Sequence, residues 1–138
     1  MMKRYPSAAL ALFASIGLAH AATPADIPFD PHAVDVVAPA DFPPSGHAYA
    51  VDFGKQQFRL DFKSSTEMTF TSPDGKNTQT VQITVTRIRP DVYMVFWSRK
   101  AGQYVVHVED FGKGVAYSNI FLPDGSVQRV KGTLTPVN

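Results

Sequence analysis

Residues 57–63 read Gln-Phe-Arg-Leu-Asp-Phe-Lys, so apolar and polar side chains alternate without a break. Successive side chains of a β-strand point to opposite faces of the sheet, and apolar residues at every second position therefore line one face. The pattern predicts a strand that turns Phe58, Leu60 and Phe62 toward a core and its charged residues toward water.

The same two-residue period continues along the chain, and turn signals interrupt it at regular intervals. Ser72-Pro73-Asp74-Gly75 and Asp124-Gly125 are typical of tight turns. Short loops favour an up-and-down order, and closing a meander into a barrel removes both unpaired edges. The sequence predicts an all-β fold, a single antiparallel up-and-down barrel of about eight strands. We expect these strands at 49–53, 57–63, around Met68 and Phe70, and at 78–89, 92–98, 104–111, 115–122 and 127–134.

Two segments precede the predicted barrel, which covers residues 47–138. Residues 1–21 have the features of a secretory signal peptide: Lys3 and Arg4, an apolar run, and a closing Ala-x-Ala site. Residues 22–46 form a proline-rich, acidic leader without Lys or Arg. No second apolar run of spanning length follows, so we expect a periplasmic protein that is not integral to the membrane.

Composition excludes several classes of function. The chain has no cysteine, which removes thiol nucleophiles and cysteine-based zinc sites, and its 13 Lys and Arg nearly balance its 12 Asp and Glu. This balance lacks the basic excess of nucleic-acid-binding proteins. No spacing links His32 or His47 to His107, so we expect no metal site and no cofactor.

Turn lengths allow the neighbours across the sheet to be estimated. With loops at 100–102, 112–113 and 124–125, Trp97 faces Val105, Val95 faces His107 and Tyr93 faces Glu109. His107 then continues to Ser118 and Lys131, and Ile120 faces Arg129. One face gathers Tyr93, Trp97, His107, Glu109, Ser118, Arg129 and Lys131; the other gathers Met94, Phe96, Val106, Val108, Tyr117, Asn119, Phe121, Val130 and Leu134. A one-residue error in a turn exchanges the faces beyond it.

Two interpretations of the mixed face remain open. If it points inward, the barrel encloses a cavity with aromatic walls and a few polar groups, the usual make-up of a small-molecule site. If it points outward, it is an ordinary solvated surface. For the inward case we predict a ligand site formed by Tyr93, Trp97, His107, Glu109, Tyr117 and Arg129.

No catalytic motif stands out in this pattern. His107 lies two positions from Glu109, and such a pair can orient a general base, but it can equally be a strand histidine satisfied by its neighbours. Glu109 and Asp110 are adjacent and point to opposite faces, which argues against paired catalytic carboxylates. Ser118 lacks a nucleophile elbow. We assign no catalytic residue.

Two strands, 92–97 and 104–108, are apolar on both sides. Their outer face needs a cover, for which the leader and a second copy of the chain are the two candidates. A homodimer is therefore one expectation.

Four stretches follow one another in a recognisable order and spacing: residues 49–54 (Tyr-Ala-Val-Asp-Phe-Gly), 92–97 (Val-Tyr-Met-Val-Phe-Trp), 105–111 (Val-Val-His-Val-Glu-Asp-Phe) and 123–125 (Pro-Asp-Gly) before a last strand containing Gly132. In these stretches the chain resembles the MoaF-like family of small lipocalin-type barrels. The resemblance implies a lipocalin-like, calycin-type barrel. In similar barrels an acidic residue often follows the tryptophan by two positions, where this chain has Arg99.

Three functions are consistent with the sequence. The first is an exported module that holds a small, partly apolar ligand, anionic if Arg129 takes part. The second is an enzyme resembling phenolic-acid decarboxylases, with Tyr93, Tyr117, Arg129 and Glu109 in the site. The third is a protein-binding or inhibitory envelope module that uses the doubly apolar strands.

Overall fold

The structure, a computed structural model, describes residues 37–138. The predicted signal peptide and the first part of the predicted leader lie outside the described residues. The described part contains one short 3-10 helix, η1 (Pro39–Asp41), and nine strands. These are β1 (Ala48–Asp52), β2 (Gln57–Phe62), β3 (Glu67–Thr71), β4 (Thr78–Gln82), β5 (Thr84–Arg89), β6 (Val92–Ser98), β7 (Tyr104–Asp110), β8 (Val115–Phe121) and β9 (Val127–Val137).

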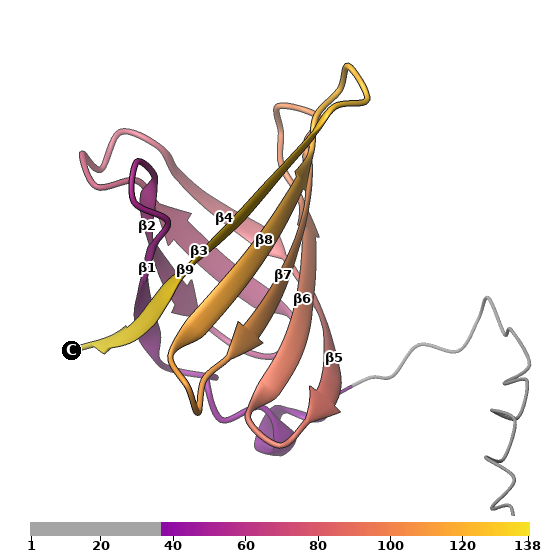
Figure 1. Cartoon of the computed structure of the whole chain (residues 1–138). Coiled ribbons are helices and arrows are strands. Elements are labelled where there is room, and N and C mark those ends of the chain that lie inside the picture. Colours follow the sequence, from indigo (N-terminus) through magenta and orange to yellow (C-terminus); the bar gives the residue numbers. More distant parts are fainter. Residues whose placement is uncertain (1–36) are drawn as a thin grey trace, which may run out of the picture. The chain divides into compact units, whose positions relative to one another are not determined.

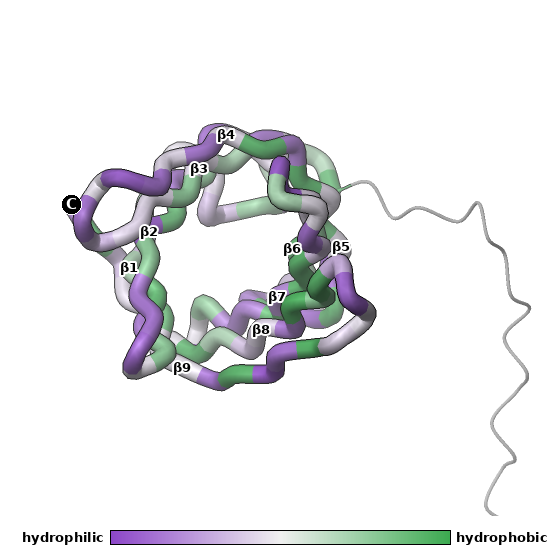
Figure 2. Tube along the Cα trace, turned by 90° about the horizontal axis from the view of Figure 1, so that it is seen from above, coloured by the Kyte–Doolittle hydropathy of each residue, from purple (hydrophilic) through white to green (hydrophobic). Residues whose placement is uncertain are grey.

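The strands form one antiparallel sheet that curls into a nearly closed barrel (Figures 1 and 2). Their order is β4-β3-β2-β1-β9-β8-β7-β6-β5. The two edge strands, β4 and β5, follow one another in the chain with only Ile83 between them. The Ile83 N–H donates to the Thr66 carbonyl at 2.9 Å. One continuous segment thus joins the two edges of the sheet, and the barrel is nearly closed although β4 and β5 are not paired with each other.

The predicted all-β barrel is therefore confirmed, but the number of strands is nine rather than eight. The expected strand at residues 78–89 is divided at Ile83, because its first half pairs with β3 and its second half with β6. A segment that changes partners must bend, and the bend breaks the ladder.

The predicted register is correct across β6, β7 and β8. Trp97 pairs with Val105, Val95 with His107, and His107 with Ser118. Paired residues lie on the same face of the sheet, and successive pairs alternate between the two faces. The side chains of Tyr93, Trp97, His107, Glu109 and Ser118 therefore share one face. All five are buried, so this face points into the barrel.

The predicted register of β9 is wrong by one residue. Ser118 pairs with Val130 instead of Lys131, and Ile120 with Gln128 instead of Arg129. The turn between β8 and β9 holds three loop residues, 123–125. The Leu122 N–H donates to the Ser126 carbonyl at 2.9 Å and so closes this loop. Gly125 has a φ of +84°, as three-residue hairpins require at the last loop position. Arg129 and Lys131 consequently point outward.

The aromatic ring of Phe42 closes one end of the barrel. This ring is 1% exposed and packs edge-on against Phe62 and Tyr93, with ring centroids 5.4 and 5.1 Å apart. The Tyr93 hydroxyl donates to the Asp41 carbonyl at 2.8 Å. The end of the expected leader is thus part of the barrel core.

The outer face of β6 to β9 exposes large apolar side chains. Tyr104 is 54% exposed, and its ring stacks on that of Phe96 with centroids 6.2 Å apart. Met94, Tyr117, Phe121 and Val127 are also exposed. The expectation that β6 and β7 are apolar on both faces is confirmed.

Candidate functional site

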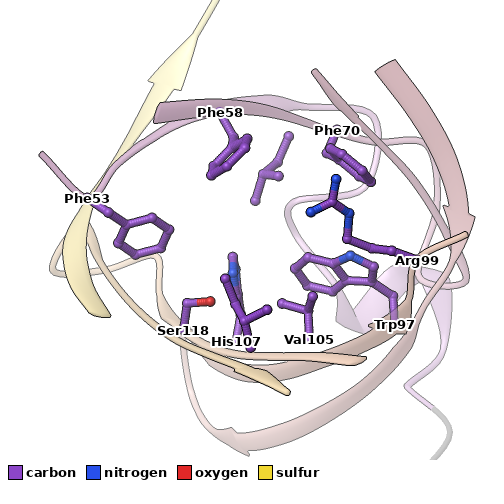
Figure 3. Close-up of a pocket in the computed structure, with 10 residues that line it drawn as sticks. Phe53, Phe58, Phe70, Trp97, Arg99, Val105, His107 and Ser118 are labelled. Carbon is purple, nitrogen blue, oxygen red and sulfur yellow. The ribbon is translucent and has the colours of Figure 1, made fainter. Parts of the chain in front are cut away.

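A small pocket is lined by residues at the end of the barrel away from Phe42. Figure 3 shows its lining side chains. Its free volume is about 40 Å³, well below the roughly 300–1,000 Å³ of sites for drug-sized ligands. A free volume of this size has room for only a few non-hydrogen atoms, since one water molecule needs about 10–15 Å³. The walls come from strands on opposite sides of the barrel and consist of Phe53, Phe58, Leu60, Phe70, Trp97, Arg99, Val105, His107, Ser118 and Ile120.

Buried His107 and Glu109 form a hydrogen-bonded pair beside this pocket. His107 Nδ1 lies 2.9 Å from Glu109 Oε1, and the side chains are 5% and 0% exposed. The two residues are two positions apart on β7, so both side chains point to the same face. The Trp97 ring packs edge-on against the imidazole, with centroids 4.6 Å apart. A carboxylate held in this way fixes the orientation of the imidazole.

The charge of Glu109 also reaches Tyr49. Burial raises the pKa of the Tyr49 phenol above its ordinary value of 10.0, and the nearby Glu109 carboxylate raises it further. A negative charge inside the barrel disfavours a second one on the phenolate.

Polar atoms without partners gather around the pocket. Among residues 37–138, five buried side-chain polar atoms lack a hydrogen bond, and four of them belong to inward-facing residues or to Arg99 at the mouth. These four are Trp97 Nε1, Arg99 Nε, Glu109 Oε2 and Ser118 Oγ. An unpaired buried polar group costs about 1–3 kcal/mol. Three of the four belong to residues that line the pocket, and Glu109 lies behind His107. A bound molecule or ordered water would pair with them.

Arg99 brings a positive charge to the mouth of the pocket. Its Nη1 donates to Gln103 Oε1 at 2.7 Å, and its guanidinium carbon lies 4.8 Å from the centre of the Phe70 ring. No carboxylate in the described part of the chain forms an ion pair with it. Its charge is available to an anion.

The structure brings together four of the six predicted ligand residues inside the barrel. Trp97 and His107 line the pocket, Glu109 lies behind His107, and Tyr93 lies deeper, against Phe42. Tyr117 and Arg129 are on the outer face, where both are exposed. The decarboxylase hypothesis required Tyr117 and Arg129 to converge with Tyr93 and Glu109, and they do not.

The sequence interpretation missed Arg99, Phe53, Phe58 and Phe70 as pocket residues. Arg99 follows β6 with the same parity as Tyr93, Val95 and Trp97, so the alternation that places Trp97 inside also places Arg99 at the barrel mouth. That signal was present in the sequence.

Two further features bear on the class of site. Residues 37–138 contain no group of three or more His, Asp or Glu side chains placed to hold a metal ion. In the same range, no helix is both long and apolar enough to cross a membrane.

Comparisons with known proteins agree with this architecture. The crystal structure of a proposed beta-lactamase from Burkholderia vietnamiensis superposes with a TM-score of 0.65 at 21% identity, covering 70% of this chain and 97% of that one. At this identity the likeness shows the fold alone. No curated protein matches the chain. The model of the MoaF-like family matches residues 45–135. The chain therefore belongs to the MoaF-like family.

Proposed function

We propose that this protein is an exported binding protein that holds a small, partly apolar, anionic molecule in the open end of its barrel. One observation carries the proposal: the pocket has aromatic walls, yet the buried Trp97 Nε1 and Arg99 Nε lack partners there. Both are donors, so the missing partner is an acceptor.

Charge and size narrow the ligand class. A half-buried guanidinium without a carboxylate partner favours an anion, and a planar carboxylate matches its donor geometry. Phe53, Phe58 and Phe70 offer apolar contact to the rest of the molecule. The small volume favours a short chain or one edge of a ring inside the pocket, with any larger part of the molecule extending out of the mouth.

Calorimetric titration with three small ligands tests this proposal. We expect benzoate to bind, and benzyl alcohol and benzylamine to bind much more weakly, because they lack the negative charge. Arg99→Gln should weaken benzoate binding by about tenfold or more, the size of a lost charge-assisted hydrogen bond.

Lys100→Gln is the matched control, since Lys100 is the next residue, is exposed and does not line the pocket. It should leave the affinity unchanged. Equal binding of all three ligands, or an equal loss in both variants, would contradict an anion site at Arg99.

The export part of the proposal rests on residues 1–21. Cell fractionation followed by N-terminal sequencing tests it, and we expect a periplasmic form that starts at Ala22. A form that retains residues 1–21 in the cytoplasm would contradict it.

The outer face of β6 to β9 favours a second candidate function, protein binding or homodimer formation. Phe96 and Tyr104 form an exposed stacked pair there. Exposed apolar clusters of this kind mark interaction surfaces. Light scattering over a concentration series should show a mass increase that Phe96→Ser with Tyr104→Ser removes and that Thr80→Ala, also exposed but on β4 outside this surface, does not. A constant monomer mass would count against self-association.

A further inference from the structure

The polar groups of the pocket are arranged in layers along the barrel axis. Cross-strand pairing places His107 and Ser118 in one layer, with Trp97, Val105 and Ile120 above them toward the mouth. Arg99 follows β6 at the mouth itself. The charged donor is therefore at one end of the pocket and the His107–Ser118 pair at the other, with apolar walls between.

The lower layer offers both an acceptor and a donor. His107 Nδ1 is hydrogen-bonded to Glu109, so a neutral imidazole donates from Nδ1 and presents Nε2 as an acceptor. Ser118 is 1% exposed, and its hydroxyl has no partner. In Figure 3 this hydroxyl points toward the His107 ring, but no hydrogen bond joins them.

We infer that this layer recognises a ligand hydroxyl, and that the ligands of the barrel are small hydroxycarboxylic acids. The inference rests on the proposed function, which supplies the carboxylate site at Arg99. A hydroxyl donates one hydrogen bond and accepts others. It can therefore donate to His107 Nε2 and accept from Ser118, which pairs both groups at once.

The cost of the buried groups supports a binding role over a structural one. Replacing both partners of a buried hydrogen bond by apolar groups of the same shape can be nearly neutral or stabilising, and here Glu109 Oε2 and Ser118 Oγ also lack a partner. Apolar side chains would fill this layer at lower cost. A site built to pair with a substrate hydroxyl rejects the analogue that lacks it, because the site's own polar groups then stay unpaired.

Calorimetry with matched ligand pairs tests the inference. The pairs are 4-hydroxybenzoate with benzoate, and 3-hydroxybutyrate with butyrate. In wild-type protein at least one hydroxylated member should bind about tenfold more tightly than its parent acid. In Ser118→Ala this preference should fall to about twofold or less, because the hydroxylated acid loses more affinity than its parent acid.

Ser98→Ala is the control, because Ser98 lies on β6 but is exposed and does not line the pocket; it should keep the full preference. The ¹⁵N resonance of His107 Nε2 gives a second measurement. It should shift on binding of the hydroxylated acid and much less with the parent acid.

The outcomes separate the two proposals. If both members of each pair bind equally, the hydroxyl site is overturned and the anion site at Arg99 stands. If the preference exists but survives in Ser118→Ala with no shift at His107, the assignment to this layer is overturned. If no acid binds, the proposed function falls and the inference falls with it.

Discussion

Gly132 shows how closely single residues are fitted in this barrel. It lies in β9 near the point where β1 ends, and a Cβ added there would be 2.0 Å from the Asp52 carbonyl oxygen. The contact is with backbone, which cannot move aside without disturbing the pairing of β1 with β9. We expect Gly132→Ala to lower the free energy of unfolding by about 3 kcal/mol, measured by urea denaturation.

Gly125→Asn is the control for this prediction. Gly125 has a positive φ of +84° and no atom within 4 Å of an added Cβ, and asparagine tolerates that conformation better than most residues. Its cost should stay within about 1 kcal/mol. If Gly132→Ala lowered the free energy of unfolding no more than Gly125→Asn does, β9 would not approach the Asp52 backbone as closely as described.

The His107–Glu109 pair leads to a prediction about coupling. His107→Leu leaves Glu109 buried without its partner, which typically costs about 3–5 kcal/mol. Adding Glu109→Leu removes the stranded carboxylate. We therefore expect the double variant to be more stable than His107→Leu alone in urea denaturation, with a coupling of about 1–3 kcal/mol between the sites. Strictly additive losses would show that the two side chains do not depend on each other.

At the scale of elements, the β8–β9 hairpin has a turn stabilised by side-chain hydrogen bonds. It is also the place where the predicted register is wrong by one residue. Asp124 Oδ1 accepts hydrogen bonds from the Ser126 N–H at 2.9 Å and the Ser126 hydroxyl at 2.6 Å. The hydroxyl, followed by the backbone N–H, lowers the pKa of the Asp124 carboxyl below its ordinary value of 3.8.

A lowered carboxyl pKa fixes the sign of the pH dependence. The folded hairpin binds the Asp124 proton less readily than the unfolded chain, so this contribution is present above pH 3.8 and is lost as the pH falls through the folded value. A ¹³C NMR titration should place the Asp124 pKa below 3.8 in wild type. In Ser126→Ala the pKa should rise toward that value; an unchanged pKa would exclude the hydroxyl as the main cause.

The same hairpin marks the limit of what sequence could predict. Asp-Gly suits both a two-residue and a three-residue loop, and the choice depends on how the strands fit the rest of the barrel. Around residues 100–102 the predicted loop is the one found, so the placement of Trp97 and His107 on one face follows from alternation alone. That this face points inward is seen only in the structure, where both side chains are buried. One extra residue at Pro123 moves Arg129 to the outside and exchanges the faces of β9.

The division of β4 from β5 could not be predicted from local pattern. Residues 81–85 read Val-Gln-Ile-Thr-Val, which alternates without a glycine or proline. The bend at Ile83 arises because the segment must reach β3 on one side and β6 on the other. Barrel closure requires this, and alternation carries no information about it. The alternation of side chains along β6, in contrast, does predict the position of Arg99, because Arg99 is two residues after Trp97. The sequence therefore held the information needed to include Arg99 in the site.

At the scale of the molecule, the two ends of the barrel have different roles. The end near Phe42 is filled by aromatic rings, with Phe111 6.2 Å and Tyr93 5.1 Å from Phe42 by ring centroids. The other end has the pocket, the unpaired donors and Arg99. A filled end fixes the barrel's shape, and the less densely packed end can then hold a ligand.

This division predicts that stability and binding can be changed separately. Phe42→Ala removes a buried ring and should lower the free energy of unfolding by about 3–5 kcal/mol, yet change benzoate affinity by less than about twofold, since Phe42 does not line the pocket. Arg99→Gln should do the reverse, because Arg99 is only partly buried and makes no ion pair within residues 37–138. Urea denaturation and calorimetry on both variants give the four values. A large loss of affinity in Phe42→Ala, measured where the variant is fully folded, would mean that the packing of the closed end also shapes the pocket.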